Sequence, residues 1–343
     1  MSISLGEDNF GEFMAVATYG VIDSILSRGF NLLGHTLSAF ENCTALASVD
    51  LSDCAALTRI KTVFEHCAAL ASVNLSGCAA LTDISYAFEH CAALASVNLS
   101  GCAALTVIFF AFQNCAALAS VDLSGCVALT HIDFAFENCA ALASVDLSGC
   151  VALTHIEFAF IQCAALASVD LSGCAALTHI AAFQNCAALA SVDLSGCVAL
   201  TDIGPAFQYC AALASVDISG CAALTHIKCA FIECAALASV DLSGCAALTH
   251  IKGAFIECGA HFSVQLSTGI ACLRLLFHGR CYSLTKIEFV HPGTVARATL
   301  LNDEVFQPAS LWTVSIFPIL YPHLNRSASV GTAGAASAPS FPN

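Results

Sequence analysis

The stretch Cys139-Ala-Ala-Leu-Ala-Ser-Val-Asp-Leu-Ser-Gly-Cys150 recurs with few changes between Cys43 and Cys245. Successive copies start 24 residues apart, except for one step of 23 residues between Cys163 and Cys186. A period of this size is typical of a protein that stacks one small unit many times. Because each unit buries its apolar face against its neighbours, such a protein grows by adding units. The chain of 343 residues is therefore predicted to form a repeat solenoid.

The full unit reads Phe-x-x-Cys-x-x-Leu-x-x-Val-x-Leu-Ser-Gly-Cys-x-x-Leu-Thr-x-Ile-x-x-Ala, and nine units occupy residues 40–258. Val145 and Leu147 alternate with Ser144, Asp146 and Ser148, which is the period-two pattern of a short strand. The following Ser-Gly turns the chain, so stacked coils are predicted to form a parallel sheet with strands about 4.8 Å apart. We expect these residues to point inward from one coil: Leu142, Val145, Leu147, Leu153 and Ile156.

One phenylalanine per coil is predicted to join a buried aromatic column, because a single coil cannot bury its apolar face alone. The column contains Phe40, Phe64, Phe88, Phe112, Phe136, Phe160, Phe183, Phe207, Phe231 and Phe255.

The pattern divides the chain into four parts. Residues 1–39 lack the repeat and carry apolar residues at helical spacing, which predicts a helical N-terminal cap over the first coil. Residues 40–289 form the solenoid of about ten coils, ending with the half-unit around Leu284 and Ile287. Residues 290–326, with Trp312 and three prolines, are interpreted as an irregular C-terminal cap. Residues 327–343 are rich in Ser, Ala, Gly and Pro, which predicts a disordered tail.

The segment Leu142-Ala-Ser-Val145-Asp-Leu147-Ser-Gly-Cys150 resembles the strand and turn of leucine-rich repeats. The Ala-Phe pair followed by x-x-Cys, with a period of 23–24 residues, resembles the BspA-like repeats of bacterial and protist surface proteins. The Leu-Ser-Gly-Cys-x-x-Leu-Thr segment is also similar to the cysteine-containing repeats of F-box proteins, but that type usually runs longer and includes a fuller helix. The period favours the BspA-like type.

This resemblance extends from residue 40 to about residue 289. It implies a leucine-rich-repeat-like solenoid with a parallel sheet on one face, short strands, turns or short helical segments on the other, and terminal caps. The chain departs from the BspA-like pattern in having Ser-Gly where a proline usually follows the strand. The Ile-Gly pair that often precedes Ala-Phe survives only as Ile203-Gly204.

The chain is acidic, with a net charge of -15. Only four basic residues occur between Cys43 and Cys258: Arg59, Lys61, Lys228 and Lys252. Such a surface argues against binding of nucleic acid or of an anionic membrane.

The stretch from His90 to Val121 has no charged residue and is long enough to resemble a membrane span. It carries polar residues at the repeat positions of its charged neighbours, so we predict no membrane span. The N-terminus lacks a basic region followed by an apolar run, which favours an intracellular location, with the cell surface as the alternative.

An acid column occupies one outward strand position: Asp50, Asp122, Asp146, Asp170, Asp193, Asp217 and Asp241, with Asn74 and Asn98 in two coils. Serine columns flank it and include Ser144, Ser148, Ser168 and Ser172. Carboxylates about 4.8 Å apart are expected to raise one another's pKa. The acid column is interpreted as a binding face for a basic partner or calcium, or as a solvated face. A flat row offers calcium only about two or three of the roughly six to eight oxygen ligands it takes.

A histidine column lies in the Leu-Thr-x-Ile half of the unit: His131, His155, His179, His226 and His250. Imidazoles on adjacent coils can share zinc or copper, which makes a weak metal column one hypothesis. Arg59, Asp83, Val107 and Asp202 hold the same position in other coils, so duplication of an exposed residue is the alternative. No resident metal or other cofactor is predicted.

Most of the 22 cysteines follow the repeat in two columns, and no Cys-x-x-Cys motif occurs. Parallel side chains in a stack are poorly oriented for disulfides, and free cysteine packs as a small apolar residue. We expect buried free thiols.

The chain is predicted not to be an enzyme. It has no Gly-rich phosphate loop, His-Glu-x-x-His or Gly-x-Ser-x-Gly motif. Its candidate Cys, His and Asp residues are all repeated, whereas a catalytic group is normally unique in its chain. The predicted function is a non-catalytic scaffold for protein or ligand recognition, whose acidic sheet face suits a basic, elongated or repetitive protein partner.

Three alternatives stay open. The resemblance implies a cell-surface adhesion protein of the BspA-like type. A structural or ice-binding ladder would use the flat rows of small polar residues to order water. An F-box-type substrate adaptor is the third, although residues 1–39 show no F-box pattern.

Overall fold

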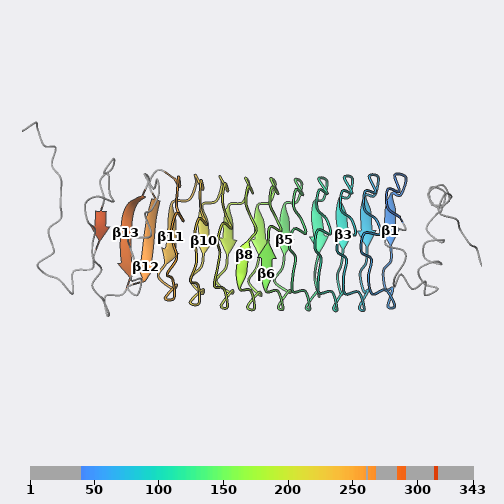
Figure 1. Ribbon diagram of the computed structural model, residues 1–343, viewed down its shortest axis with the longest axis horizontal. Helices are drawn as coiled ribbons and strands as arrows, with labels where there is room; N and C mark the ends of the chain where they lie inside the picture. The colour runs from blue at the N-terminus through green and yellow to red at the C-terminus, as the bar shows by residue number, and fades with distance from the viewer. Residues whose placement is uncertain (1–39, 260–261, 268–283, 291–312, 316–343) are drawn as a thin grey trace, which may run out of the picture.

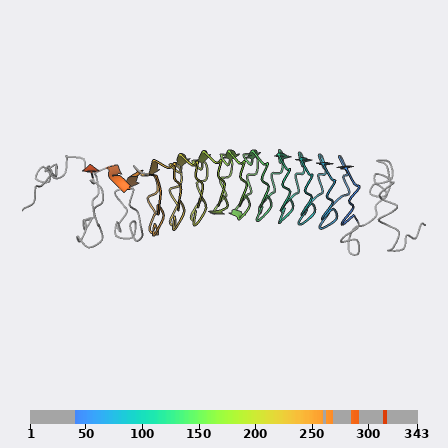
Figure 2. The same ribbon diagram turned by 90° about the horizontal axis from the view of Figure 1, so that it is seen from above.

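The computed structural model describes residues 40–259, 262–267, 284–290 and 313–315. Its coils stack side by side into an elongated solenoid, and each coil contributes one short strand to the same face (Figure 1). Seen from above, these strands lie along one edge of the coils (Figure 2). The described part contains strands and turns but no helix. The predicted solenoid with a parallel sheet on one face is therefore confirmed.

The repeat strands have the sequence Ser-Val-Asp or Ser-Val-Asn. They are β1 (Ser48–Asp50), β2 (Ser72–Asn74), β3 (Ser96–Asn98), β4 (Ser120–Asp122), β5 (Ser144–Asp146), β7 (Ser168–Asp170), β9 (Ser191–Asp193), β10 (Ser215–Asp217) and β11 (Ser239–Leu242). Within each paired block, equivalent residues of successive coils face one another in parallel register, as Ser48 faces Ser72. Three blocks result: β1 to β4, β5 to β10, and a third that begins with β11.

The third block continues beyond the regular repeat through β12 (Phe262–Ser267), β13 (Leu284–Val290) and β14 (Thr313–Ser315), all parallel. Strand β14 lies within residues 290–326, for which the sequence predicts an irregular cap. The rest of that cap, the predicted helical cap at residues 1–39 and the predicted tail at residues 327–343 lie outside the described residues.

A second ladder runs along the other side of the coils. It consists of single parallel bridges between equivalent residues, and it widens to paired strands only at β6 (His155–Glu157) and β8 (His179–Ala181). In most coils, including that of β6, a residue with left-handed backbone follows three positions after the bridge, as in Tyr86 with φ 60° and Phe158 with φ 55°. The 23-residue coil is one residue short here, so its chain stays extended through Ala181 and two paired strands form.

The core is one continuous column along the solenoid. The ten phenylalanines of the aromatic column stack from coil to coil, with ring centroids 5.3 to 5.7 Å apart. The five residues predicted to point inward from one coil are also buried. Val145 is 2% exposed, and the other four are fully buried. Both predictions are confirmed. Because each ring packs on the rings above and below, the core depends on neighbouring coils.

The Ser-Gly turn takes two conformations along the chain. Gly77, Gly101 and Gly125 have φ between 74° and 82°, whereas Gly149 and the later turn glycines do not. From Gly173 onward, a side chain on the glycine would overlap the serine carbonyl oxygen of the preceding coil. The change of conformation falls where the sheet is interrupted, between β4 and β5.

The uncharged stretch from residue 90 to 121 forms ordinary coils around β3 and β4. No helix among the described residues has the length and apolar character needed to cross a membrane.

Candidate functional site

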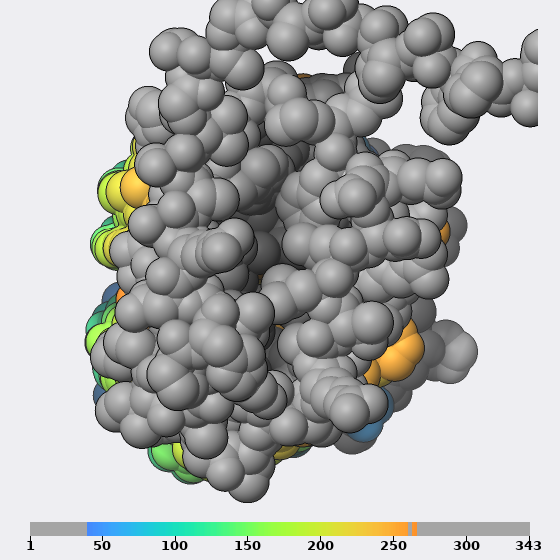
Figure 3. Space-filling model, turned by 90° about the vertical axis from the view of Figure 1, so that its left-hand side faces the viewer, coloured from blue at the N-terminus to red at the C-terminus, as the bar shows by residue number. Residues whose placement is uncertain are grey.

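The sheet face is built by the alternation of Ser-Val-Asp. The valine points into the core, so the serine and the aspartate or asparagine point outward on either side of it. Because successive coils stack in register, outward side chains form rows along the solenoid. Seen end-on, the repeat coils overlap one another as green and yellow spheres at the left edge of Figure 3. All seven aspartates of the acid column are exposed, as are Ser144 and Ser168 on β5 and β7.

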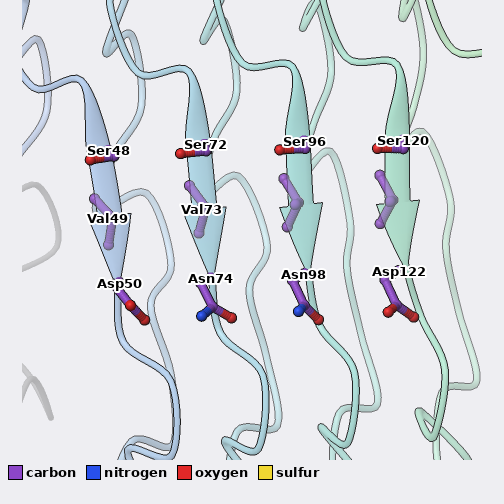
Figure 4. Close-up of a pocket in the computed structure, with 12 residues that line it drawn as sticks. Ser48, Val49, Asp50, Ser72, Val73, Asn74, Ser96, Asn98, Ser120 and Asp122 are labelled. Carbon is purple, nitrogen blue, oxygen red and sulfur yellow. The ribbon is translucent and has the colours of Figure 1, made fainter.

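A groove of about 480 Å³ crosses β1 to β4 on this face. One row of lining residues consists of serines, and the opposite row is Asp50, Asn74, Asn98 and Asp122 (Figure 4). The valines between the rows also line the groove. The two asparagines in the middle leave this part of the acid column less charged than the part from Asp122 to Asp241.

Each residue of the acid column also shapes its own coil. Its Oδ1 accepts the backbone N–H of the serine two residues later, at 2.8 to 3.1 Å in all nine coils. Ser148 and Ser172 thus serve the turn with their backbone as well as lining the face. Asn74 and Asn98 make the same bond, since an asparagine side-chain oxygen is an equivalent acceptor. This turn could have been predicted from the sequence, because the position holds only Asp or Asn in every coil. Both side chains accept the backbone N–H two residues later and so stabilise turns.

The expectation of mutually raised carboxyl pKa values is wrong for Asp146 and Asp193. Hydrogen bonds from the hydroxyl and the backbone N–H of Ser148 lower the pKa of Asp146 from its ordinary value. The same two groups of Ser195 lower the pKa of Asp193. Hydrogen bonding stabilises the charged form, and water screens the repulsion between exposed neighbours. These two carboxylates therefore remain charged at neutral pH.

The histidine column lies on the second ladder, away from the acid column. His131, His155 and His179 stack with ring centroids 5.3 and 5.0 Å apart. His226 and His250 stack at 4.0 Å.

A threonine column fixes the tautomer of these rings. The hydroxyl of each threonine donates to the threonine carbonyl oxygen one coil earlier, at 2.9 to 3.3 Å. Its oxygen lies 2.7 to 3.0 Å from Nδ1 of the histidine that follows it. Because the hydroxyl hydrogen is already used, we assign the donated hydrogen to Nδ1. The neutral ring then keeps its Nε2 as the acceptor.

The described residues contain no group of three or more His, Cys, Asp or Glu side chains placed to hold a metal ion. A stacked histidine pair supplies two ligands, fewer than the four usual for zinc. The weak metal column and the calcium face therefore stay hypotheses.

The two cysteine columns are buried from the second coil onward, as predicted, and no disulfide joins the cysteines that the structure describes. The thiols donate to backbone carbonyl oxygens one coil earlier, as Cys139 does to Phe112 at 3.1 Å. Burial raises the pKa of Cys102 and of Cys150 to about 11. Such thiols are protonated and poorly reactive at neutral pH. Cys229, outside both columns, is half-buried.

Comparison with protein families finds matches to the BspA type Leucine rich repeat region, in six copies, at residues 36–132, 107–228 and 181–307. Among solved structures, a leucine rich cell surface protein from Faecalibacterium prausnitzii is 22% identical, with 72% of this chain and 79% of that chain covered and a TM-score of 0.35. A leucine-rich repeat protein from Eubacterium ventriosum is 13% identical, with 62% and 83% covered and a TM-score of 0.38. The leucine-rich repeat protein of T. pallidum is 21% identical, with 55% and 81% covered and a TM-score of 0.29. No curated protein matches.

Proposed function

Because the chain belongs to the BspA-type leucine-rich repeat family, we propose that it is a non-catalytic scaffold that binds a protein partner across its sheet face. The partner we infer is basic and elongated. This proposal rests on the face itself, since the family match establishes the repeat and not the partner.

The acid column is the observation that carries the proposal. From Asp122 to Asp241, six successive coils each present an exposed carboxylate. With strands about 4.8 Å apart, the row from first to last is roughly 24 Å long. None of the nine repeat strands contains a lysine or an arginine. A row of one sign attracts and orients a partner of the opposite sign. An extended chain with regularly spaced lysines or arginines fits such a row better than a compact protein.

The groove over β1 to β4 would add orientation. Its central Asn74 and Asn98 offer amide donors as well as acceptors, whereas the aspartates offer acceptors only. The partner's polar, uncharged segment would lie here, and its basic segment would lie along β5 to β11. All these backbone strands already pair with neighbours, so recognition would use side chains and not an added strand.

Binding of a fluorescein-labelled decalysine peptide, followed by fluorescence anisotropy in low salt, tests the proposal. The triple variant Asp170→Asn/Asp193→Asn/Asp217→Asn removes three charges and keeps an acceptor for each turn hydrogen bond. We expect about tenfold weaker binding, from roughly 0.5 kcal/mol per exposed charge. The opposite variant, Asn74→Asp/Asn98→Asp, should strengthen binding and serves as the matched control. Equal affinity of the native chain and the triple variant would refute the acid column as the binding face.

A cell-surface adhesion role would use the same face on a different partner. The Faecalibacterium prausnitzii protein is described as a cell surface protein, which supports keeping this role as the alternative. Surface labelling of intact source cells with a membrane-impermeant reagent distinguishes the two.

A further inference from the structure

Basic residues occur on only one side of the repeat coils, whereas acids occur on both. The four basic residues of the repeat region all lie on the second ladder or two residues beyond it, at equivalent positions of their coils: Arg59, Lys61, Lys228 and Lys252. In the nine repeat strands, by contrast, every charged residue is an aspartate. The second ladder therefore carries positive charge at both of its ends.

At the C-terminal end, two adjacent coils carry the same His-Ile-Lys segment. The backbone N–H of Ile227 donates to the carbonyl oxygen of His250 at 2.8 Å, and that of Cys229 donates to Lys252 at 3.2 Å. The segments therefore lie side by side, with a single parallel bridge between His226 and His250 and a turn that begins at each lysine. Ile227 and Ile251 are buried, so the residues on either side of each isoleucine point outward.

These outward residues form a basic cluster, defined as His226, Lys228, His250 and Lys252. Both lysines and His250 are exposed, and His226 is half-buried. The two rings stack at 4.0 Å, and each directs Nδ1 to a threonine hydroxyl. Their Nε2 atoms remain available to a ligand, and each becomes a second donor when the ring takes up a proton.

At the N-terminal end of the second ladder, a carboxylate of the neighbouring coil neutralises the lysine. Lys61 forms a salt bridge of 2.6 Å with Asp83 of the next coil. Lys228 and Lys252 form no salt bridge with any described carboxylate. The nearest acid along the ladder is Asp202, which bridges to His226 and uses one oxygen for the N–H of Gly204. Glu233 and Glu257 follow five residues after the lysines, beyond the next turn.

We propose that the basic cluster binds a phosphate or sulfate ester group of an anionic partner. Two ammonium groups on adjacent coils, about 4.8 Å apart at the backbone, would hold two oxygens of a tetrahedral dianion. The histidine Nε2–H groups would donate to the remaining oxygens once protonated. Because each protonated ring adds a positive charge and a second N–H donor, we expect binding to strengthen as the pH falls from 8 to 5.5. Asp202 opposes the anion from one side and limits the gain.

Titration calorimetry on the full chain in low salt tests this site, with two probes of different source: a heparin-derived tetrasaccharide for sulfate esters and inorganic tripolyphosphate for phosphates. The variant Lys228→Ser/Lys252→Ser uses the residue that coil 2 carries at this position, Ser85. The affinity of this variant for the probe should fall about tenfold, because it lacks the two ammonium groups that hold the anion. Low salt is needed because exposed charges are screened at higher ionic strength. The control Lys61→Ser removes a lysine already paired with Asp83 and should change affinity less than about twofold.

A second variant, His226→Val/His250→Val, uses the residue found at this position in coil 3, Val107. It should retain binding at pH 8 and lose most of the rise in affinity towards pH 5.5. Binding of one probe and not the other would identify the ester class. Absence of heat with both probes at pH 5.5, or an equal loss in Lys61→Ser, would overturn the proposal.

Discussion

Replacing Asp193 separates the structural from the electrostatic role of the acid column. Its Oδ1 accepts the N–H of Ser195 at 2.8 Å at the end of β9. In Asp193→Ala that N–H loses its partner, and we expect a loss of about 1 kcal/mol, the usual value for one such hydrogen bond or cap. In Asp193→Asn the acceptor is kept, as it is in Asn74 and Asn98 at 3.1 and 2.9 Å, so we expect a loss below about 0.5 kcal/mol. Both variants remove the same charge, so their difference isolates the hydrogen bond.

The pH dependence provides an independent check. The pKa of Asp193 in the folded chain is lowered by the hydroxyl and backbone N–H of Ser195. A lowered pKa stabilises the fold above the carboxyl's unfolded value, near ~3.9, and that stabilisation is lost as the pH falls through the lower folded value. The native chain should therefore lose this increment below about pH 4, and neither variant should show it.

The assay is urea unfolding followed by circular dichroism at pH 7 and pH 3, combined with hydrogen exchange in the segment around Ser195. The exchange measurement is needed because a solenoid can unfold locally, coil by coil. If Asp193→Asn is as destabilising as Asp193→Ala, the charge and not the hydrogen bond supports the turn, and our reasoning is refuted.

Three further perturbations address the core, the turns and the thiols. Phe136→Ala should cost about 3–5 kcal/mol in urea unfolding, because its ring stacks on both neighbours in the buried column; a loss below about 1 kcal/mol would contradict the column as the core. Gly173→Ala should destabilise the chain by about 1–3 kcal/mol, because the new methyl group would overlap the backbone oxygen of Ser148. In Gly149→Ala the new methyl carbon would lie 4.0 Å from the nearest atom, the backbone nitrogen of Gly125, so the unfolding midpoint should change little. Equal effects of the two variants would refute the two turn conformations. Iodoacetamide under native conditions, read by mass spectrometry, should modify half-buried Cys229 well before buried Cys150, whose pKa is raised to about 11; simultaneous modification would show that the column opens readily.

Much of the fold follows from sequence periodicity. The 24-residue period predicts coils in register, and Ser48 does face Ser72 across the sheet. The alternation of Val145 with outward Ser144 and Asp146 predicts which side chains are buried. These features are local or repeat without change, so one coil is enough to infer them.

The candidate site was only partly predictable. The acid column and its exposure follow from the same alternation, but the hydrogen bond from Ser195 to Asp193 does not, and it reverses the expected direction of the pKa shift. The orientation of the histidine rings was also hidden, because it depends on a threonine hydroxyl whose acceptor lies one coil away.

The sequence by itself determined the repeat, the inward phenylalanine and cysteine columns, and the outward rows of serine and aspartate, because each of these depends on spacing within one unit. Only the tertiary structure decided the two turn conformations of identical Ser-Gly segments and the widening of the second ladder at the 23-residue coil. It also decided that Lys61 pairs with Asp83, whereas Lys228 and Lys252 form no salt bridge with a described carboxylate. These depend on what the neighbouring coil places about 4.8 Å away, and contacts of that range are set by stacking and not by the unit alone.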